Sequence, residues 1–131
     1  MIDTHCHLDD EQYKEDIDEV IQRAKNAGIN KIFVPGICRK DMPHLINICN
    51  KNKGFLYPMV GLHPENIMDE DYKSVLSDME NMISESIIGI GEIGLDLYWD
   101  DTHEKEQIEV FEHQIGWAIK YKLPLMLHIR K

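Results

Sequence analysis

The chain begins Met1-Ile2-Asp3-Thr4-His5-Cys6-His7, a short apolar start followed at once by two histidines that one residue separates. Side chains two positions apart on an extended segment point to the same face, so His5 and His7 can bind one metal ion together. Asp3 shares that face and can orient a ligand imidazole or form an interior hydrogen bond. Histidines near a strand end are also often solvated or bonded to the backbone, so this pattern alone favours metal binding only slightly.

Short apolar runs alternate with longer amphipathic stretches along the rest of the chain, which is the pattern of β-α units. We expect strands at the N-terminus and over 31–34, 55–60, 87–90 and 125–127. We expect helices over 11–27, from Asp41 as N-cap toward Asn52, along a stripe from Tyr72 to Ile83, and over about 102–122. The last helix is predicted to bury Ile108, Phe111, Ile115, Ala118 and Ile119.

The predicted strands end near His5, Pro35, Gly61, Gly91 and His128, spaced by about one β-α unit of ~30 residues. Such a series fits either an open doubly wound sheet or part of a (β/α)8 TIM barrel. Length alone favours the open sheet, because a barrel typically needs ~250 residues. Distinctive side chains at several strand ends favour a barrel mouth instead. We therefore predict one α/β domain over residues 1–131, covering about five strands and four helices of a (β/α)8 barrel.

The composition is that of a globular protein, with 131 residues, 43% of them hydrophobic and 29% charged. The 14 Lys and Arg against 24 Asp and Glu give a net charge of −10, which argues against a broad basic surface for nucleic acid. No apolar run approaches the ~20 residues that cross a bilayer, and the N-terminus lacks the pattern of a signal peptide. The three cysteines form no even framework. These features predict a cytoplasmic protein without membrane contact.

A carboxylate strengthens the metal interpretation of the first strand. Glu92 stands in the glycine-rich stretch Gly89-Ile90-Gly91-Glu92-Ile93-Gly94-Leu95-Asp96, directly after a predicted strand. A lone glutamate there could cap a helix or face solvent, but its two oxygens can also bridge two ions. His128 ends the apolar run that starts at Leu123 and can supply a ligand to the second ion. Taken alone, His128 would be interpreted as a strand-end histidine bonded to the backbone.

These residues resemble the TatD family of metal-dependent nucleases, which belongs to the amidohydrolase-like barrels. The resemblance lies in residues 2–8, Gly61-Leu62-His63-Pro64, residues 91–96, and Leu123-Pro124 followed by His128-Ile129-Arg130. Gln107, Phe111 and Gln114 also fit the fourth helix of the family.

The resemblance implies a first metal held by His5, His7 and Glu92, and a second held by His128 with Glu92 as the bridging catalytic carboxylate. Mg, Mn and Zn are the candidate divalent ions, and mixed imidazole and carboxylate ligands suit Mg less readily than the others. The implied activity is two-metal hydrolysis of phosphodiester bonds in DNA. Two alternatives stay open: a related hydrolase acting on an ester such as D-aminoacyl-tRNA, and a truncated remnant or scaffold without catalysis.

Three further residues are candidates for substrate binding. His63 follows the third predicted strand, where it can contact a substrate phosphate or serve as a structural turn residue. Asp96 lies in the predicted loop after Glu92 and can line a substrate cleft. Arg130 can clamp a phosphate or form a salt bridge with a carboxylate at the mouth, and the sequence favours neither. Cys6 is predicted to be a buried, inert thiol that points away from the histidines.

The family's barrel is about twice as long as this chain. Its later half provides another histidine and a late aspartate, which nothing after His128 can supply. We therefore expect an N-terminal half-barrel with unpaired strand edges, which predicts self-association or dependence on further sequence. Its first metal should bind better than its second.

Overall fold

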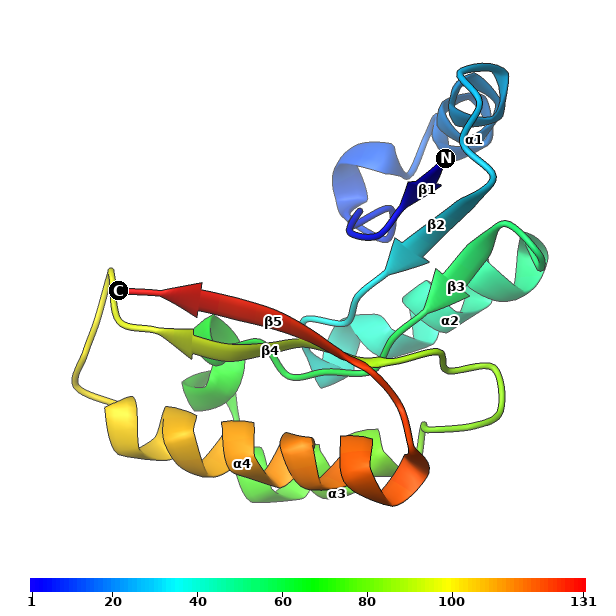
Figure 1. The fold of residues 1–131 in the computed structure, drawn as a ribbon. Helices are drawn as coiled ribbons and strands as arrows, with labels where there is room; N and C mark the ends of the chain where they lie inside the picture. The colour runs from blue at the N-terminus through cyan, green and yellow to red at the C-terminus, as the bar shows by residue number, and fades with distance from the viewer.

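The fold alternates strands and helices along the chain, in a computed structural model that describes all residues 1–131 (Figure 1). The strands are β1 Ile2–Asp3, β2 Lys31–Val34, β3 Leu56–Pro58, β4 Ile90–Asp96 and β5 Leu125–Arg130. The α-helices are α1 Ile17–Asn26, α2 Met42–Lys51, α3 Tyr72–Glu80 and α4 Glu104–Tyr121. Three short 3-10 helices stand between them: η1 Glu11–Tyr13, η2 Arg39–Asp41 and η3 Pro64–Asp69.

All strand pairs are parallel, and each strand lies beside the next one in the sequence. One sheet has the order β1-β2-β3 and another pairs β4 with β5, while a bridge from Val60 to Ile90 links the two. Parallel neighbours in sequential order, joined by helical connections, build a stepwise curved wall. The chain is therefore an α/β protein whose five strands form a partial barrel, as the sequence predicts.

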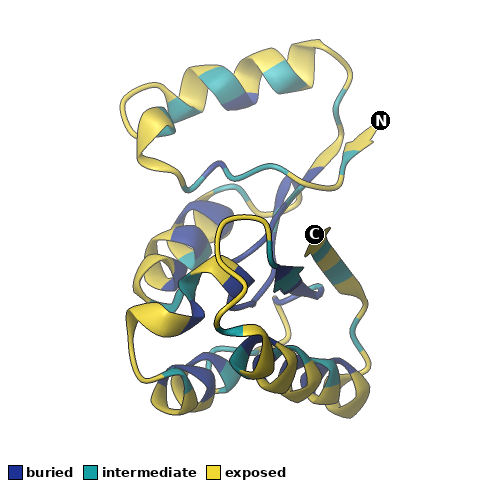
Figure 2. Ribbon diagram, turned by 90° about the vertical axis from the view of Figure 1, so that its left-hand side faces the viewer, coloured by how far each residue is buried: buried dark blue, intermediate teal, exposed yellow.

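The core lies between these strands and the helices that cover them. Helix α4 lies against β4, and α3 lies beside α4 and contacts η2 and η3 (Figure 1). Figure 2 shows that the buried parts of the helices face the interior of the molecule. The apolar side chains that are removed from water between the helices and the strands provide the main stabilising term. The fully enclosed members include Val34, Met42, Leu45, Val60, Met79, Ile90, Ile93 and Val110.

Glycines let the backbones of β4 and its neighbours approach closely. Gly94 has a φ of +148°, and a Cβ there would overlap the carbonyl oxygen of His128 on β5. A Cβ on Gly91 would come within 2.6 Å of the Met126 Cβ. Gly94 pairs with His128 in the strand register, and these contacts explain why only glycine fits at position 94.

Several predicted boundaries are wrong. The fourth strand starts at Ile90 and continues through Glu92 to Asp96, so the glycines lie inside the strand. The first helix is divided into η1 and α1, because Asp10 caps a short turn that ends before Asp16. Asp41 makes no side-chain capping bond to α2, and its carboxylate accepts the Cys38 thiol at 3.2 Å instead.

The predicted buried face of the last helix is right only in part. Ala118 is buried and Phe111 and Ile115 pack on the core while partly exposed, but Ile108 and Ile119 are 39% and 75% exposed. The face that packs on the strands carries Gln107, Val110, Gln114, Trp117 and Ala118. The residues of this face recur at helical spacing, just as the isoleucines do. Because two of them are glutamines, the face does not stand out as an apolar stripe in the sequence.

The last strand, β5, leaves apolar side chains uncovered. Leu125, Leu127 and Ile129 alternate along one face of β5 and are 38%, 51% and 63% exposed. An apolar row of this kind is normally covered in a β-α fold. No helix of the chain is long and apolar enough to cross a membrane.

The cysteines are free thiols with no partner for a disulfide. Cys6 is half-buried against the core, and burial raises the pKa of its thiol above the usual value. Burial raises the pKa of Cys49 to about 12. Both thiols are therefore protonated at neutral pH. Cys6 is partly exposed, so the prediction that it is buried is wrong.

Two glycine substitutions test the close contact between β4 and β5. Gly94→Ala should lower the free energy of unfolding by about 3 kcal/mol, because the new Cβ overlaps the backbone of His128. Gly116→Ala, in the exposed middle of α4 with open space around it, should raise the free energy by about 0.5–1 kcal/mol. Urea denaturation of both variants measures this, and equal stabilities would contradict the packing described.

Candidate metal centre

The buried carboxylate of Glu92 lies at the centre of a group of histidines. Glu92 Oε2 lies 3.2 Å from His5 Nε2 and 3.2 Å from His7 Nε2. Its other oxygen, Oε1, lies 3.1 Å from His128 Nδ1. One carboxylate, 5% exposed, therefore faces imidazoles from the segment after β1 on one side and from β5 on the other.

The segment after β1 turns the two N-terminal histidines toward this carboxylate. Pairing of β1 with β2 fixes its start, and the Cys6 N–H donates to the Phe33 carbonyl of β2. The Asp3 carboxylate accepts the backbone N–H of His5 at 3.1 Å. Of the two alternatives for Asp3, the structure shows no bond to an imidazole, and the bond that it does show is to backbone at the surface.

Backbone hydrogen bonds between the ends of β2 and β4 hold Glu92 in place. The Gly36 N–H donates to the Gly91 carbonyl at 2.8 Å, and the Glu92 N–H donates back to the Gly36 carbonyl at 2.8 Å. A Cβ on Gly36 would come within 2.9 Å of the backbone of Gly61. The segments after β2 and β3 thus meet β4 where Glu92 begins, with no room for side chains between them.

Asp96 belongs to the same centre. It ends β4 instead of lying in a loop as predicted, it is 3% exposed, and its Oδ2 lies 2.8 Å from His128 Nε2. Gln107 holds it from α4: the Asp96 N–H donates to Gln107 Oε1 and the Gln107 amide donates to the Asp96 carbonyl, each at 2.9 Å. Asp96 therefore clamps the His128 ring, which the sequence did not predict.

His63 is buried beside His128, with their ring centres 4.4 Å apart. His63 Nδ1 accepts the backbone N–H of Glu65 at 3.1 Å at the start of η3. Burial lowers the pKa of His63 to about 4, so the ring is neutral near pH 7. A neutral imidazole that accepts at Nδ1 carries its proton on Nε2. His63 therefore presents an N–H donor.

A second glutamine on α4 fixes the segment that carries His63. The Leu62 N–H donates to Gln114 Oε1 at 2.8 Å, and the Gln114 amide donates to the Leu62 carbonyl at 3.1 Å. Gln107 and Gln114 lie two helical turns apart, and each satisfies both backbone groups of one residue next to the centre. In the sequence these glutamines resemble the family's fourth helix, and nothing there predicts their bonds to the backbone. Their helical spacing with Val110 and Trp117 is the signal that places them on the buried face.

Arg130 lies beside aromatic side chains instead of a carboxylate. Its guanidinium carbon is 4.0 Å from the centre of the Tyr98 ring and 5.3 Å from that of Trp99. Tyr98 and Trp99 follow β4, and both are exposed. The salt bridge that the sequence left open is absent, and the positive charge of Arg130 stays available at the surface.

The electrostatics of the centre favour an ionised carboxylate. Burial by itself raises the pKa of Glu92, but the hydrogen bond from His7 and the charge of His5 outweigh it and lower the pKa to about 2. The same hydrogen bond to Glu92 raises the pKa of His7. Glu92 is therefore negatively charged at any physiological pH and attracts cations.

The donor atoms fit a metal ion. The Nε2 atoms of His5 and His7 lie 3.1 Å apart, and each lies 3.2 Å from Glu92 Oε2. Ligand atoms that bind one ion tetrahedrally at about 2.1 Å are separated by about 3.4 Å, close to these distances. On the other side, His128 Nδ1 faces Glu92 Oε1 at 3.1 Å and His128 Nε2 faces Asp96 Oδ2 at 2.8 Å. An imidazole that donates its Nε2 proton to Asp96 keeps a lone pair on Nδ1, and that lone pair can bind a cation beside Glu92.

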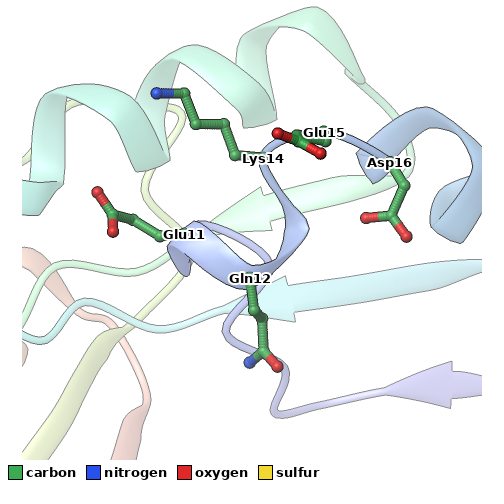
Figure 3. A pocket seen from close by; sticks show the side chains of 5 residues that line it. All are labelled: Glu11, Gln12, Lys14, Glu15 and Asp16. Atoms are coloured by element: carbon green, nitrogen blue, oxygen red, sulfur yellow. The ribbon is translucent and has the colours of Figure 1, made fainter.

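One hollow in the surface reaches the metal centre and another lies apart from it. One of 630 Å³ reaches His7 and is lined also by Asp9, Asp10, Lys40 and Ile37, so it leads to the candidate metal ligands. Another of 420 Å³ is formed by residues 11–16 alone. Its charged side chains are spread along the turn (Figure 3) and form no ion pair with one another, so this hollow has no relation to the metal centre.

Comparison with known proteins identifies the family. Residues 2–131 match the family described as TatD related DNase. The chain belongs to the TatD family. It is 35% identical over 130 residues to YabD of Bacillus subtilis, which is named an uncharacterized metal-dependent hydrolase. The aligned region covers 99% of the chain and 51% of YabD. The chain spans about half the length of the TatD relatives it matches.

Solved structures of TatD proteins share the fold. The crystal structure of YjjV, a TatD homologue from Escherichia coli, matches with a TM-score of 0.89 at 32% identity and covers 100% of the chain and 51% of that structure. A TatD family hydrolase from Entamoeba histolytica matches with a TM-score of 0.78 at 30% identity, over 100% of the chain and 50% of its own. The α/β architecture described above is thus that of TatD proteins.

Glu92→Gln tests the role of the carboxylate in binding metal. The amide keeps the size of the side chain but loses its charge, so we expect affinity for Zn²⁺ or Mn²⁺ to fall at least tenfold with little change in the fold. Calorimetric titration of the chain measures this. His44→Ala, which removes an exposed histidine on α2, is the control and should bind as the unchanged chain does. Equal binding by the Glu92 variant would exclude this centre.

Proposed function

We propose that the chain supplies the metal-binding part of a divalent-metal-dependent hydrolase that cleaves phosphodiester bonds in nucleic acid. The observation that carries the proposal is the position of Glu92, whose two oxygens face histidines on opposite sides. His5, His7 and Glu92 would hold the first ion, and Glu92 with His128 the second. Bound divalent ions would activate water and offset the negative charge of a phosphoryl group.

The names of relatives support nucleic acid as the substrate. A protein of Erwinia billingiae, 25% identical over 130 residues, is named 3'-5' ssDNA/RNA exonuclease TatD, and a human protein 28% identical over 142 residues is named Deoxyribonuclease TATDN3. The net charge of −10 is compatible with such a substrate if metal ions supply the positive charge locally. The cytoplasmic location and self-association stay predictions.

The residues around Glu92 take distinct parts in this proposal. His63, held by the bond from Glu65 N–H, would donate its Nε2 proton in a hydrogen bond to a phosphoryl oxygen. Asp96 would keep the His128 ring in its orientation and its Nδ1 free for a metal. His63 and Asp96 lie close enough to complete a group at the second ion. Only Glu92 and His128 are assigned to that ion here, against three residues for the first. The second ion should therefore bind more weakly than the first.

Substitution of His63 tests whether this residue donates a hydrogen bond to the substrate or binds a metal ion. His63→Ala should leave the metal content unchanged but lower kcat for cleavage of a single-stranded DNA about a hundredfold, because one donor to the phosphoryl group is lost. Glu92→Gln should lose both metal and cleavage. Metal analysis and a cleavage assay on the protein in its natural full length measure this.

Each outcome of that experiment decides a specific point. Loss of metal in His63→Ala would show that His63 is a ligand. Failure of the unchanged protein to cleave phosphodiesters while it hydrolyses D-aminoacyl esters would favour the ester hydrolase. Failure on both substrates with metal bound would favour a scaffold.

A further inference from the structure

A hollow of 340 Å³ lies next to the metal centre, between η3 and the segment that joins β4 to α4. Pro64, Met68 and Trp99 contribute apolar surface to it, and Glu65, Asp96 and Asp100 contribute carboxylates. Trp99 is 73% exposed and Met68 is 48% exposed. Two large apolar side chains thus remain in contact with water around one hollow, which marks a binding surface more than a packing role.

The walls of the hollow select the chemistry of an occupant. Trp99 offers the face of a large aromatic ring, on which another flat ring can stack. The exposed carboxylates of Glu65 and Asp100 repel a phosphate, but the oxygens that they leave free accept hydrogen bonds from amino groups. Asp96 forms the buried floor, because its two oxygens already contact the Tyr98 N–H and His128. A flat, uncharged ring that carries an amino group meets both conditions. Adenine, cytosine and guanine are rings of this kind, whereas thymine and uracil lack the exocyclic amino group.

The hollow is connected with the metal centre through a shared residue. Asp96 lines the hollow and also contacts His128 at 2.8 Å. On the outer side, Trp99 packs edge to face on Tyr98 at 4.7 Å, and Arg130 lies over Tyr98. The order along this surface is therefore metal centre, acceptor-lined hollow, aromatic pair and exposed cation. A nucleotide strand presents phosphate, base and phosphate in the same order.

We propose that this hollow binds an unpaired, amino-bearing nucleobase, stacked on Trp99, of the strand whose phosphodiester lies at the metal centre. Arg130 then faces a backbone phosphate next to that base. This inference rests on the proposed function and makes its substrate single-stranded, because a base inside a duplex cannot stack on Trp99. Base stacking on aromatic side chains is the usual means of holding single strands without a fixed sequence.

Binding without hydrolysis tests the proposal. Fluorescence anisotropy with labelled octanucleotides is measured on the full-length protein in EDTA, so that the strand is not cleaved. Trp99→Ala should weaken binding of oligo(dC) about tenfold or more and leave binding of an abasic strand of the same length unchanged. Tyr121→Ala, which removes an exposed aromatic ring at the end of α4, is the control and should bind both strands normally.

Tryptophan fluorescence gives an independent measurement on the unchanged protein. Trp99 is exposed and Trp117 is 2% exposed, so a stacked base should quench the signal of Trp99 alone. Oligo(dC) and oligo(dA) should quench more strongly than oligo(dT), and Trp99→Phe should remove the effect.

Equal weakening of the base-containing and abasic strands by Trp99→Ala would overturn the proposal. Binding of oligo(dT) as tight as that of oligo(dC) would overturn the part assigned to the carboxylates. Absence of metal-dependent cleavage with intact base binding would count against the proposed function alone, since these measurements are made without metal.

Discussion

The arrangement of this chain depends on one buried carboxylate that faces three imidazoles. Burying Glu92 is costly unless its charge is compensated, and His5, His7 and His128 lie at 3.1–3.2 Å from its oxygens. These histidines come from opposite ends of the chain, so the carboxylate joins the first strand to the last. The fold must hold its backbone firmly for this, and the reciprocal hydrogen bonds between Gly36 and the Gly91–Glu92 segment do so.

Helix α4 supplies the second layer of support. A helix that only packed apolar side chains would leave the backbone of the strand-end segments without hydrogen-bond partners. Gln107 and Gln114 satisfy the N–H and carbonyl of Asp96 and Leu62. Removal of such a buried partner typically costs about 1–3 kcal/mol. The glutamines therefore connect the stability of the partial barrel with the positions of Asp96 and His63, and the same segments form the walls of the hollow beside Trp99.

The sequence predicts the order of strands and helices well, since apolar runs and amphipathic stretches alternate clearly. It also places the histidines and Glu92 correctly at one end of the sheet. The limits of β4 were wrong because glycines disfavour a strand locally, whereas Gly94 is required by the approach of the His128 backbone. The clamp on His128 by Asp96 was missed because strand register decides it, and periodicity does not determine register.

Anomalous diffraction at the absorption edge of bound Zn²⁺ or Mn²⁺ tests the central claim most directly. Crystals of the chain grown with the metal should show a strong peak about 2.0–2.2 Å from the Nε2 atoms of His5 and His7 and from Glu92 Oε2. A weaker second peak is expected between Glu92 and His128. A metal-saturated crystal with no peak at His5 and His7, and with the three side chains in the hydrogen-bonded positions described here, would contradict the account.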